Sequence, residues 1–156
     1  MSTIHLIRHA KAKSRLAWEE PDELRPLTKR GRREAAVLAA RLGEQPLARL
    51  VSSPFVRCVQ TLEPLAVALD LPIETTDLLA EGADGARAAG LMLSLSADGA
   101  IACCTHGDVL FDVVDLVAES GVGLDAPRAA PVASTWVLSV EDGGFVGAQF
   151  VDQPPR

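Results

Sequence analysis

A short, uninterrupted apolar segment constrains the fold of this chain most. Residues 100–105 read Ala-Ile-Ala-Cys-Cys-Thr. They lack the alternation of polar and apolar residues that is typical of a strand with one solvent-exposed face. Such a segment is suited to a strand that is covered on both faces, as in parallel sheets. Parallel neighbours need long connections, which are usually helices. The segment therefore predicts an α/β protein.

The rest of the chain alternates between strand and helix patterns, as this fold class requires. The strand patterns lie at 3–8, 49–52 and 73–75, and the helix patterns lie at 29–42, 55–69, 84–95 and 109–119. Thr28 fits the N-cap of the first helix, Gly43 fits its end, and Pro64 must kink or split the second. Residues 135–140 and 145–151 predict a closing hairpin, with Asp-Gly or Gly-Gly at its tip.

We expect a three-layer α/β/α sandwich, with a mostly parallel central sheet, helices on both faces and a C-terminal antiparallel hairpin. The 156 residues, 48% of them hydrophobic, fit one compact domain over 1–156. No apolar run approaches the roughly 18 residues of a membrane span. We therefore expect a cytoplasmic protein without a membrane partner. The three cysteines have no metal-binding spacing and are predicted to be core residues.

Positive charge is concentrated at the start of the chain. Residues 1–33 contain nine of the 15 Lys and Arg residues but only four of the 21 Asp and Glu residues. Such a field attracts small anions, whereas a nucleic-acid-binding protein is usually basic over a whole face. We therefore expect a small or phosphorylated anionic partner and no nucleic acid. The four cations at 29–33 also fit a solvated helix start.

Polar residues follow three of the predicted strands. Arg8-His9 follows the first strand, residues 52–57 with Arg57 follow the second, and His106 follows the segment at 100–105. Because the carboxyl ends of parallel strands share one edge of the sheet, these side chains are expected to surround one ligand.

Two imidazoles and two guanidiniums suit phosphoryl transfer. A neutral imidazole attacks phosphorus without a metal or other cofactor, which makes His9 the candidate nucleophile. Arg8 and Arg57 would bind the phosphoryl oxygens, and His106 would donate a hydrogen bond to them. Glu81, in the loop after the third strand, is the candidate proton donor, with the neighbouring Asp77 and Asp84 as alternatives.

These motifs resemble the histidine phosphatase superfamily, in its phosphoglycerate-mutase-like branch. The matching segments are LIRHA at 6–10, RPLT at 25–28, SSPFVRCVQT at 52–61, EG at 81–82 and THG at 105–107. The short length and the RPLT segment are most similar to SixA-type phosphohistidine phosphatases and to phosphatase domains associated with Nudix hydrolases. The resemblance implies that His9 is phosphorylated, that Arg8, Arg57 and His106 bind the phosphoryl group, and that Glu81 donates a proton. Ala10 stands where the commonest family motif has Gly.

Other residues near the motifs have two interpretations each. The SixA-like resemblance brings Arg25 into the phosphate site, but a structural arginine that bonds loop carbonyls fits equally well. Four residues after the nucleophile could contact substrate, although we favour a mobile surface loop: Lys11, Lys13, Ser14 and Arg15. His5 is predicted to be structural, and Trp18 is a candidate for the pocket entrance.

The sequence thus predicts a metal-independent phosphatase that acts through a covalent phosphohistidine intermediate on His9. Its substrate would be a protein phosphohistidine, a nucleotide or a small phosphorylated metabolite. The alternative from another class is a noncatalytic phosphate-binding or regulatory domain. Retention of both histidines and both arginines argues against that alternative.

Overall fold

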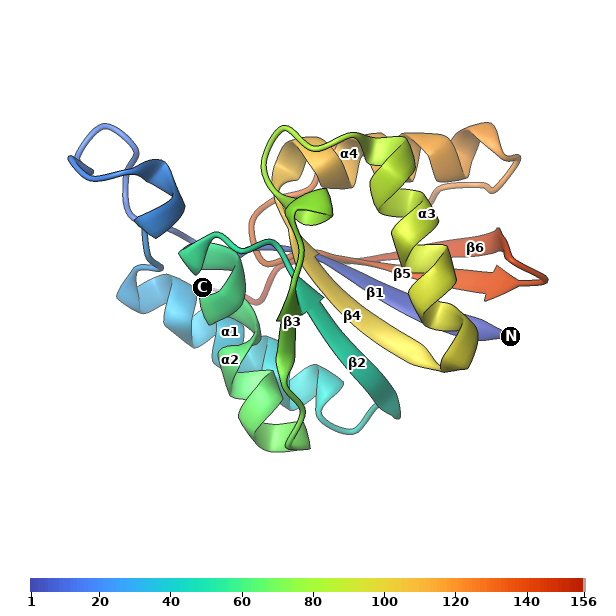
Figure 1. The fold of residues 1–156 in the computed structure, drawn as a ribbon, viewed down its shortest axis with the longest axis horizontal. Coiled ribbons are helices and arrows are strands. Elements are labelled where there is room, and N and C mark those ends of the chain that lie inside the picture. Colours follow the sequence, from blue (N-terminus) through green and yellow to red (C-terminus); the bar gives the residue numbers. More distant parts are fainter. Residues whose placement is uncertain (156) are drawn as a thin grey trace.

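The computed structural model describes residues 1–155 and contains a six-stranded sheet between two layers of helices (Figure 1). The strands are β1 (Ser2–Arg8), β2 (Leu47–Ser52), β3 (Ile73–Thr75), β4 (Ala100–Thr105), β5 (Thr135–Glu141) and β6 (Gly144–Val151). The helices are α1 (Lys29–Leu42), α2 (Val56–Leu69), α3 (Gly85–Leu95) and α4 (Gly107–Glu119), with short 3-10 helices at Asp22–Leu24, Asp77–Leu79 and Ser96–Asp98.

The strand order in the sheet is β3-β2-β4-β1-β5-β6. The first four strands in this order run parallel, whereas β5 and β6 are antiparallel to their neighbours. The predicted α/β sandwich with its C-terminal hairpin is therefore confirmed. Because β1, β2 and β4 are adjacent and parallel, their carboxyl ends lie together at one edge, as the sequence predicted.

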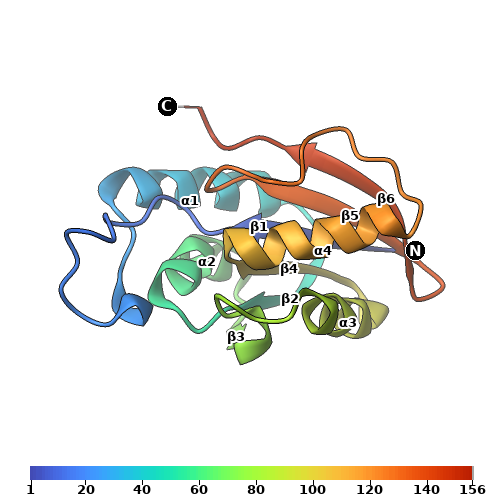
Figure 2. The ribbon, with the colours of Figure 1, turned by 90° about the horizontal axis from the view of Figure 1, so that it is seen from above.

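The two faces of the sheet are covered by different helices (Figure 2). Ala102 and Cys104 of β4 pack with α1 and α2, whereas Ile101 and Cys103 pack with α3 and α4. All four of these side chains are fully buried. The uninterrupted apolar sequence of β4 thus follows from its position at the centre of the sheet, with a core on each face.

Most predicted boundaries hold to within two residues, and the predicted helix at 29–42 is found unchanged. Thr28 caps it by accepting a hydrogen bond from Gly31 N at 3.0 Å. The helix α2 is continuous through Pro64, so the predicted split does not occur. The helix α4 begins at Gly107, two residues before the predicted start. Its first turn therefore lies directly after His106, at the edge of the sheet where the candidate site is expected.

The cysteines behave as core residues, and all three are buried and free. The hairpin tip uses Asp142 and Gly143, both with positive φ, as a tight turn between β5 and β6 requires. Within residues 1–155, no helix combines the length and the apolar character needed to cross a membrane.

Candidate active site

A pocket of about 600 Å³ opens where the parallel strands end. It is formed by the segment after β1, the loop before α3, the first turn of α4 and the loop before β5. Its lining residues are Arg8, His9, Lys11, Ala12, Lys13, Ser14, Arg15, Arg25, Glu81, Gly107, Asp108, Ala129, Ala130 and Val132. The pocket has the size of a small-molecule site and a mostly polar lining.

Hydrogen bonds fix the position of His9 at the end of β1. Its backbone N–H donates to Thr105 O at 3.1 Å, which ties it to the end of β4. Its Nδ1 lies 2.8 Å from Ala10 O. Because a carbonyl oxygen only accepts hydrogen bonds, Nδ1 carries the proton and Nε2 carries the lone pair. The next residue is anchored in turn, since Ala10 N donates to Thr61 Oγ1 at 2.9 Å.

The environment of His9 keeps its ring neutral. Burial lowers the pKa of His9 to about 3, and the electrostatic effects of His106, Arg57 and Arg8 act in the same direction. The hydrogen bond to Ala10 opposes this shift but is weaker than burial. The imidazole is therefore unprotonated at Nε2 at neutral pH, which is the form that can act as a nucleophile.

Arg8 lies across the start of α4. Its Nη1 donates to Ala130 O at 2.5 Å, and its guanidinium lies close to Gly107. A Cβ at position 107 would lie 3.0 Å from Arg8 Cζ, which is tighter than an ordinary contact, so a larger residue there would make the guanidinium shift. Burial lowers the pKa of Arg8, and the charge of Asp108 opposes that shift.

His106 lies opposite His9, with 5.4 Å between the ring centroids. Its Nε2 is 2.9 Å from Ser53 Oγ, and its Nδ1 is 3.4 Å from Arg57 Nη2. The Phe55 ring packs edge-on against the imidazole at 4.8 Å, while the Arg57 guanidinium lies 5.0 Å from the same Phe55 ring. His106 is thus held in place from three sides.

Arg57 is completely buried beside the pocket and is paired with Asp22. Its Nη2 donates to Asp22 Oδ2 at 3.0 Å, and its Nη1 donates to Asp22 O at 2.9 Å. Its Nε has no hydrogen-bond partner in residues 1–155. Arg25 Nε donates to the other oxygen of the same carboxylate at 2.9 Å. Burial acts to raise the pKa of Asp22, but Arg25 and Arg57 outweigh it, so the pKa is lowered and the group stays ionised.

Glu81 is the one of the three candidate loop carboxylates that lines the pocket. Its Oε1 accepts from Arg15 Nη2 at 3.1 Å and lies 3.6 Å from Arg57 Nη2. The loop is fixed at the next residue, where Gly82 N donates to Asp108 Oδ2 at 2.8 Å. Asp84 instead caps α3 through Ala86 N.

The structure brings the predicted site residues together. Arg8, His9, Glu81 and Arg25 line the pocket, and the buried Arg57 and His106 adjoin it through the contacts above. Arg25 also bonds a loop carbonyl, since its Nη1 donates to Lys13 O at 2.6 Å. Arg25 therefore fits both interpretations, because it lines the pocket and also bonds a loop carbonyl.

The loop after the nucleophile lies at the surface, as predicted, since all four of its named residues are exposed; they also line the pocket, as the alternative interpretation required: Lys11, Lys13, Ser14 and Arg15. One minor prediction needs correction. Trp18 does not line the pocket; its Nε1 donates to Pro21 O at 3.0 Å. His5 lies in β1, outside this site, as predicted.

Sequence reasoning missed three residues that organise the site: Asp22, Ser53 and Asp108. Asp22 precedes Arg25 by three residues, a spacing that one 3-10 turn brings together, and this was the available signal. Ser53 belongs to a motif already singled out, but only its distance to His106 reveals its role. Asp108 has the pattern of an exposed helix charge, and its contact with Gly82 depends on the tertiary fold.

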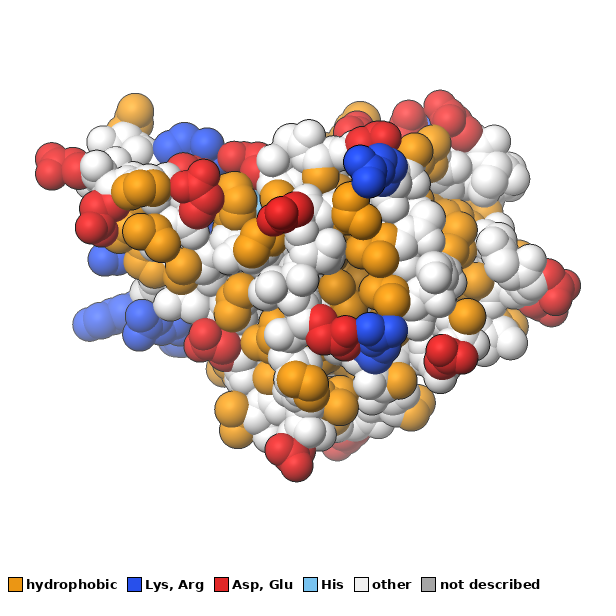
Figure 3. All heavy atoms as spheres, in the orientation of Figure 1, with side chains coloured by type: hydrophobic (Ala, Val, Ile, Leu, Met, Phe, Trp, Pro, Cys, Tyr) orange, Lys and Arg blue, Asp and Glu red, His pale blue; other side chains and the backbone are white. Residues whose placement is uncertain are grey.

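No group of three or more His, Cys, Asp or Glu side chains within residues 1–155 could hold a metal ion. The pocket is rich in cations, with five Lys or Arg residues among its lining. Figure 3 shows further Lys and Arg side chains gathered at the start of α1, outside the pocket lining, and acidic side chains on the loop that precedes α1.

Comparison with known proteins identifies the family. Residues 4–91 match the histidine phosphatase superfamily, branch 1. A curated 8-oxo-(d)GTP phosphatase from Mycolicibacterium smegmatis is 35% identical over 156 residues, which covers 97% of this chain and 48% of the relative. The chain thus spans about half the length of that relative.

Solved structures share the fold. The protein histidine phosphatase SixA, solved with tungstate, has a TM-score of 0.76 at 22% identity, covering 97% of this chain and 95% of SixA. YhfR from Bacillus stearothermophilus has a TM-score of 0.77 at 20% identity, covering 94% of this chain and 95% of YhfR.

The fold and the pocket define a hydrolase of the phosphatase class. The chain belongs to the histidine phosphatase superfamily, branch 1.

Proposed function

We propose that residues 1–156 form a single phosphatase domain that hydrolyses phosphomonoesters or phosphoramidates through a covalent phosphohistidine on His9. The observation that carries this proposal is the contact of His9 Nδ1 with Ala10 O at 2.8 Å. It fixes the tautomer that leaves the Nε2 lone pair for attack on phosphorus. The low pKa of His9, about 3, keeps that lone pair available at neutral pH.

Arg8, Arg57 and His106 bind the transferred phosphoryl group. Its equatorial oxygens carry negative charge, which planar guanidiniums complement with paired hydrogen bonds. Arg8 lines the pocket, and the buried Arg57 has an Nε donor without a partner in residues 1–155. His106 lies opposite His9, with 5.4 Å between the ring centroids, and its Nδ1 accepts from Arg57 Nη2 at 3.4 Å, so the two side chains lie side by side at the phosphoryl site. These groups supply the charge stabilisation that a metal supplies elsewhere, which is why we propose metal-independent catalysis.

Glu81 protonates the leaving group. Its carboxyl group lines the pocket, where it can reach a leaving group, whereas Asp22 is not among the lining residues and its carboxylate is engaged by Arg25 and Arg57. In the second half of the reaction, Glu81 removes a proton from the water that attacks phosphohistidine. Bond formation by that water releases phosphate and restores neutral His9.

Two substrate classes have support. The curated relative is an 8-oxo-(d)GTP phosphatase, which favours a nucleotide. SixA is a protein histidine phosphatase, and its complex with tungstate, a tetrahedral oxyanion, favours an anion site of the kind described above.

The test measures kcat/KM in the presence of a chelator, with p-nitrophenyl phosphate and with an alkyl phosphate. We expect His9→Gln to reduce turnover of both by at least about a thousandfold. Glu81→Gln should reduce turnover of the alkyl phosphate by about 100-fold, and much less for p-nitrophenyl phosphate, whose leaving group needs little protonation. His5→Gln is the matched control outside the site. Full activity in His9→Gln, or loss of wild-type activity in chelator, would contradict the proposal.

A further inference from the structure

Two lysines at the pocket have no ionic partner in the described structure. Five Lys or Arg side chains line the pocket against two carboxylates. Arg15 is paired with Glu81, Arg25 with Asp22, and Arg8 faces Asp108. Lys11 and Lys13 form no ion pair within residues 1–155. The positive charges of Lys11 and Lys13 are therefore not neutralised by a carboxylate of the described structure.

The backbone that bears these lysines is fixed in place. Lys11 N donates to Glu34 Oε1 at 2.9 Å, and Lys11 O accepts from Thr28 N at 2.9 Å. Lys13 N donates to Pro26 O at 3.0 Å, and Lys13 O accepts from Arg25 Nη1 at 2.6 Å. Both lysines are thus presented from a defined position.

The segment is extended, which sets the direction of its side chains. Ala12, between the two lysines, forms an antiparallel bridge with Leu27 and is buried, whereas Lys11 and Lys13 are exposed. Residues two apart in an extended chain point to the same side and lie roughly 7 Å apart along it. The two ammonium groups can therefore bind one anionic group together, next to the phosphoryl site at His9.

The pocket also has an apolar part to its lining. This part consists of the small apolar residues Ala129, Ala130 and Val132, from the loop before β5. A ligand in the pocket can therefore contact both cations and an apolar surface. This combination suits a small organic molecule that bears more than one phosphate.

We propose that Lys11 and Lys13 form a second anion subsite, and that the substrate is an organic phosphoanhydride such as a nucleoside diphosphate or triphosphate. This proposal rests on the phosphatase mechanism proposed above. The terminal phosphoryl group binds at Arg8 and His9, and the adjacent phosphate binds between the two lysines.

Phosphoryl transfer to His9 breaks one bond for each bond that it forms. His9 Nε2 forms a bond to the terminal phosphorus while the bond from that phosphorus to the bridging oxygen breaks. The electron pair stays on the departing phosphate, whose developing charge Lys11 and Lys13 stabilise. Water then cleaves the N–P bond, which yields inorganic phosphate and restores neutral His9.

The experiment compares ADP and GDP with AMP and GMP, with p-nitrophenyl phosphate as the reference substrate. We expect wild-type kcat/KM to be at least about tenfold higher for the diphosphates than for the monophosphates. In the double variant Lys11→Gln/Lys13→Gln, kcat/KM for the diphosphates should fall at least about tenfold more than kcat/KM for p-nitrophenyl phosphate, mainly through KM. Thermal melting establishes that the variant is folded.

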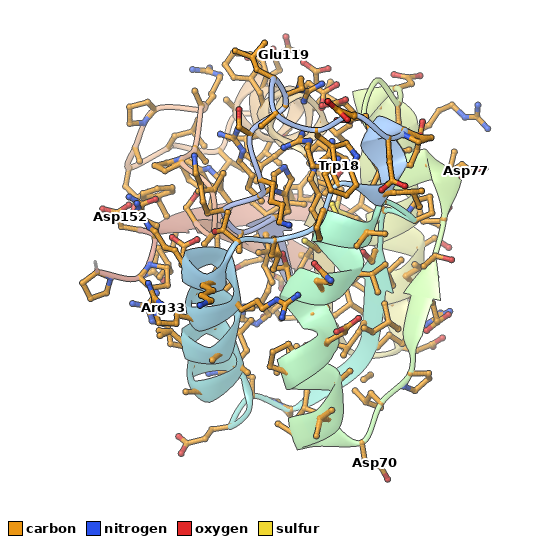
Figure 4. All side chains as sticks on the ribbon, turned by 90° about the vertical axis from the view of Figure 1, so that its left-hand side faces the viewer. Trp18, Arg33, Asp70, Asp77, Glu119 and Asp152 are labelled. Carbon is orange, nitrogen blue, oxygen red and sulfur yellow. The ribbon has the colours of Figure 1, made fainter. Side chains whose placement is uncertain are left out.

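Arg33→Gln is the matched control for loss of charge. Arg33 is exposed on α1, forms no ion pair among residues 1–155, and is not one of the pocket's lining residues (Figure 4). We expect this variant to keep the preference for diphosphates.

Three outcomes would overturn the proposal. They are a preference for monophosphates, an equal loss on all substrates in the double variant, and the same selective loss in Arg33→Gln. Failure of the proposed phosphatase mechanism is distinguishable, because it would leave His9→Gln active on p-nitrophenyl phosphate or make wild-type turnover of that substrate sensitive to a chelator.

Discussion

At the scale of single residues, the site depends on groups that direct protons. Ser53 Oγ lies 2.9 Å from His106 Nε2 and also accepts from Phe55 N at 3.2 Å. A hydroxyl can donate or accept, so Ser53 is compatible with either tautomer of His106. Arg57 Nη2 can only donate, so its contact with His106 Nδ1 places the lone pair of the imidazole on Nδ1 and the proton on Nε2, where Ser53 Oγ accepts it. We infer that Ser53 thereby holds the His106 ring in position beside the phosphoryl site.

Ser53→Ala tests this role of the hydroxyl. Removal of the hydroxyl leaves the Nε2 proton of His106 buried without that acceptor and loosens the ring. We expect kcat for p-nitrophenyl phosphate to fall by about ten- to 100-fold. Ser53→Thr keeps the hydroxyl and should retain more activity than Ser53→Ala. Equal activity of the alanine variant and the wild-type protein would show that Ser53 does not position His106.

Gly107 tests the position of the Arg8 guanidinium. A Cβ at this residue would lie 3.0 Å from Arg8 Cζ and 3.1 Å from Arg8 Nε, so Gly107→Ala shifts the guanidinium by a few tenths of an ångström. We expect kcat/KM to fall, but by less than the roughly 100-fold that a misplacement of about 1 Å costs. The sequence motif at 105–107 already indicated that the glycine belongs to the site. The contact with Arg8 that explains it became visible only in the structure.

At the scale of elements, the segment after β1 packs against the first turn of α1. Gly31 allows this approach, because a Cβ there would lie 2.1 Å from Lys11 O. The sequence predicted α1 to the residue, since its N-cap, apolar face and terminal glycine all agree. The packing of residues 10–13 against it could not be predicted, because it depends on backbone hydrogen bonds that residue types do not specify.

Gly31→Ala and Gly90→Ala form a matched pair of helix substitutions. Alanine normally stabilises a helix interior by about 0.5–1 kcal/mol relative to glycine. We expect that gain at Gly90, in α3, where an added Cβ has no atom within 4 Å. At Gly31, the clash should instead lower the free energy of unfolding by about 1–3 kcal/mol. Urea denaturation measures both, and stabilisation by Gly31→Ala would refute the tight contact.

At the scale of the whole molecule, the parallel sheet brings the site residues together at one edge, where His9, Arg57 and His106 are buried. The alternation of strands and helices was enough to predict that three strand ends meet, because that follows from topology alone. The ion pairs of Asp22 with Arg25 and Arg57 follow from how a long loop folds over the sheet edge. No periodicity in the sequence encodes such a loop.

Burial of His9 makes the free energy of unfolding depend on pH. The pKa of His9 is about 3 in the folded protein and near 6.5 in the unfolded chain. Below pH 6.5 the unfolded chain therefore binds a proton that the folded protein does not, and stability falls as the pH drops. Between about pH 6.5 and pH 5 this group should remove about 2 kcal/mol.

Urea denaturation at about pH 7.5 and about pH 5 measures this loss. The variant His9→Gln lacks the titrating group and should lose correspondingly less stability between the two conditions. His5, whose pKa burial also lowers, remains in both proteins and cancels in the comparison. An identical pH dependence in the variant would mean that His9 titrates normally in the folded state.

The central claim is that His9 Nε2 becomes covalently phosphorylated. The most direct measurement is the intact mass of the wild-type protein after rapid mixing with p-nitrophenyl phosphate and an alkaline quench, followed by localisation of the modified residue. The account predicts an acid-labile adduct of one phosphoryl group on His9, formed in the presence of a chelator and absent from His9→Gln. Turnover without any such adduct, or an adduct on another residue, would contradict it.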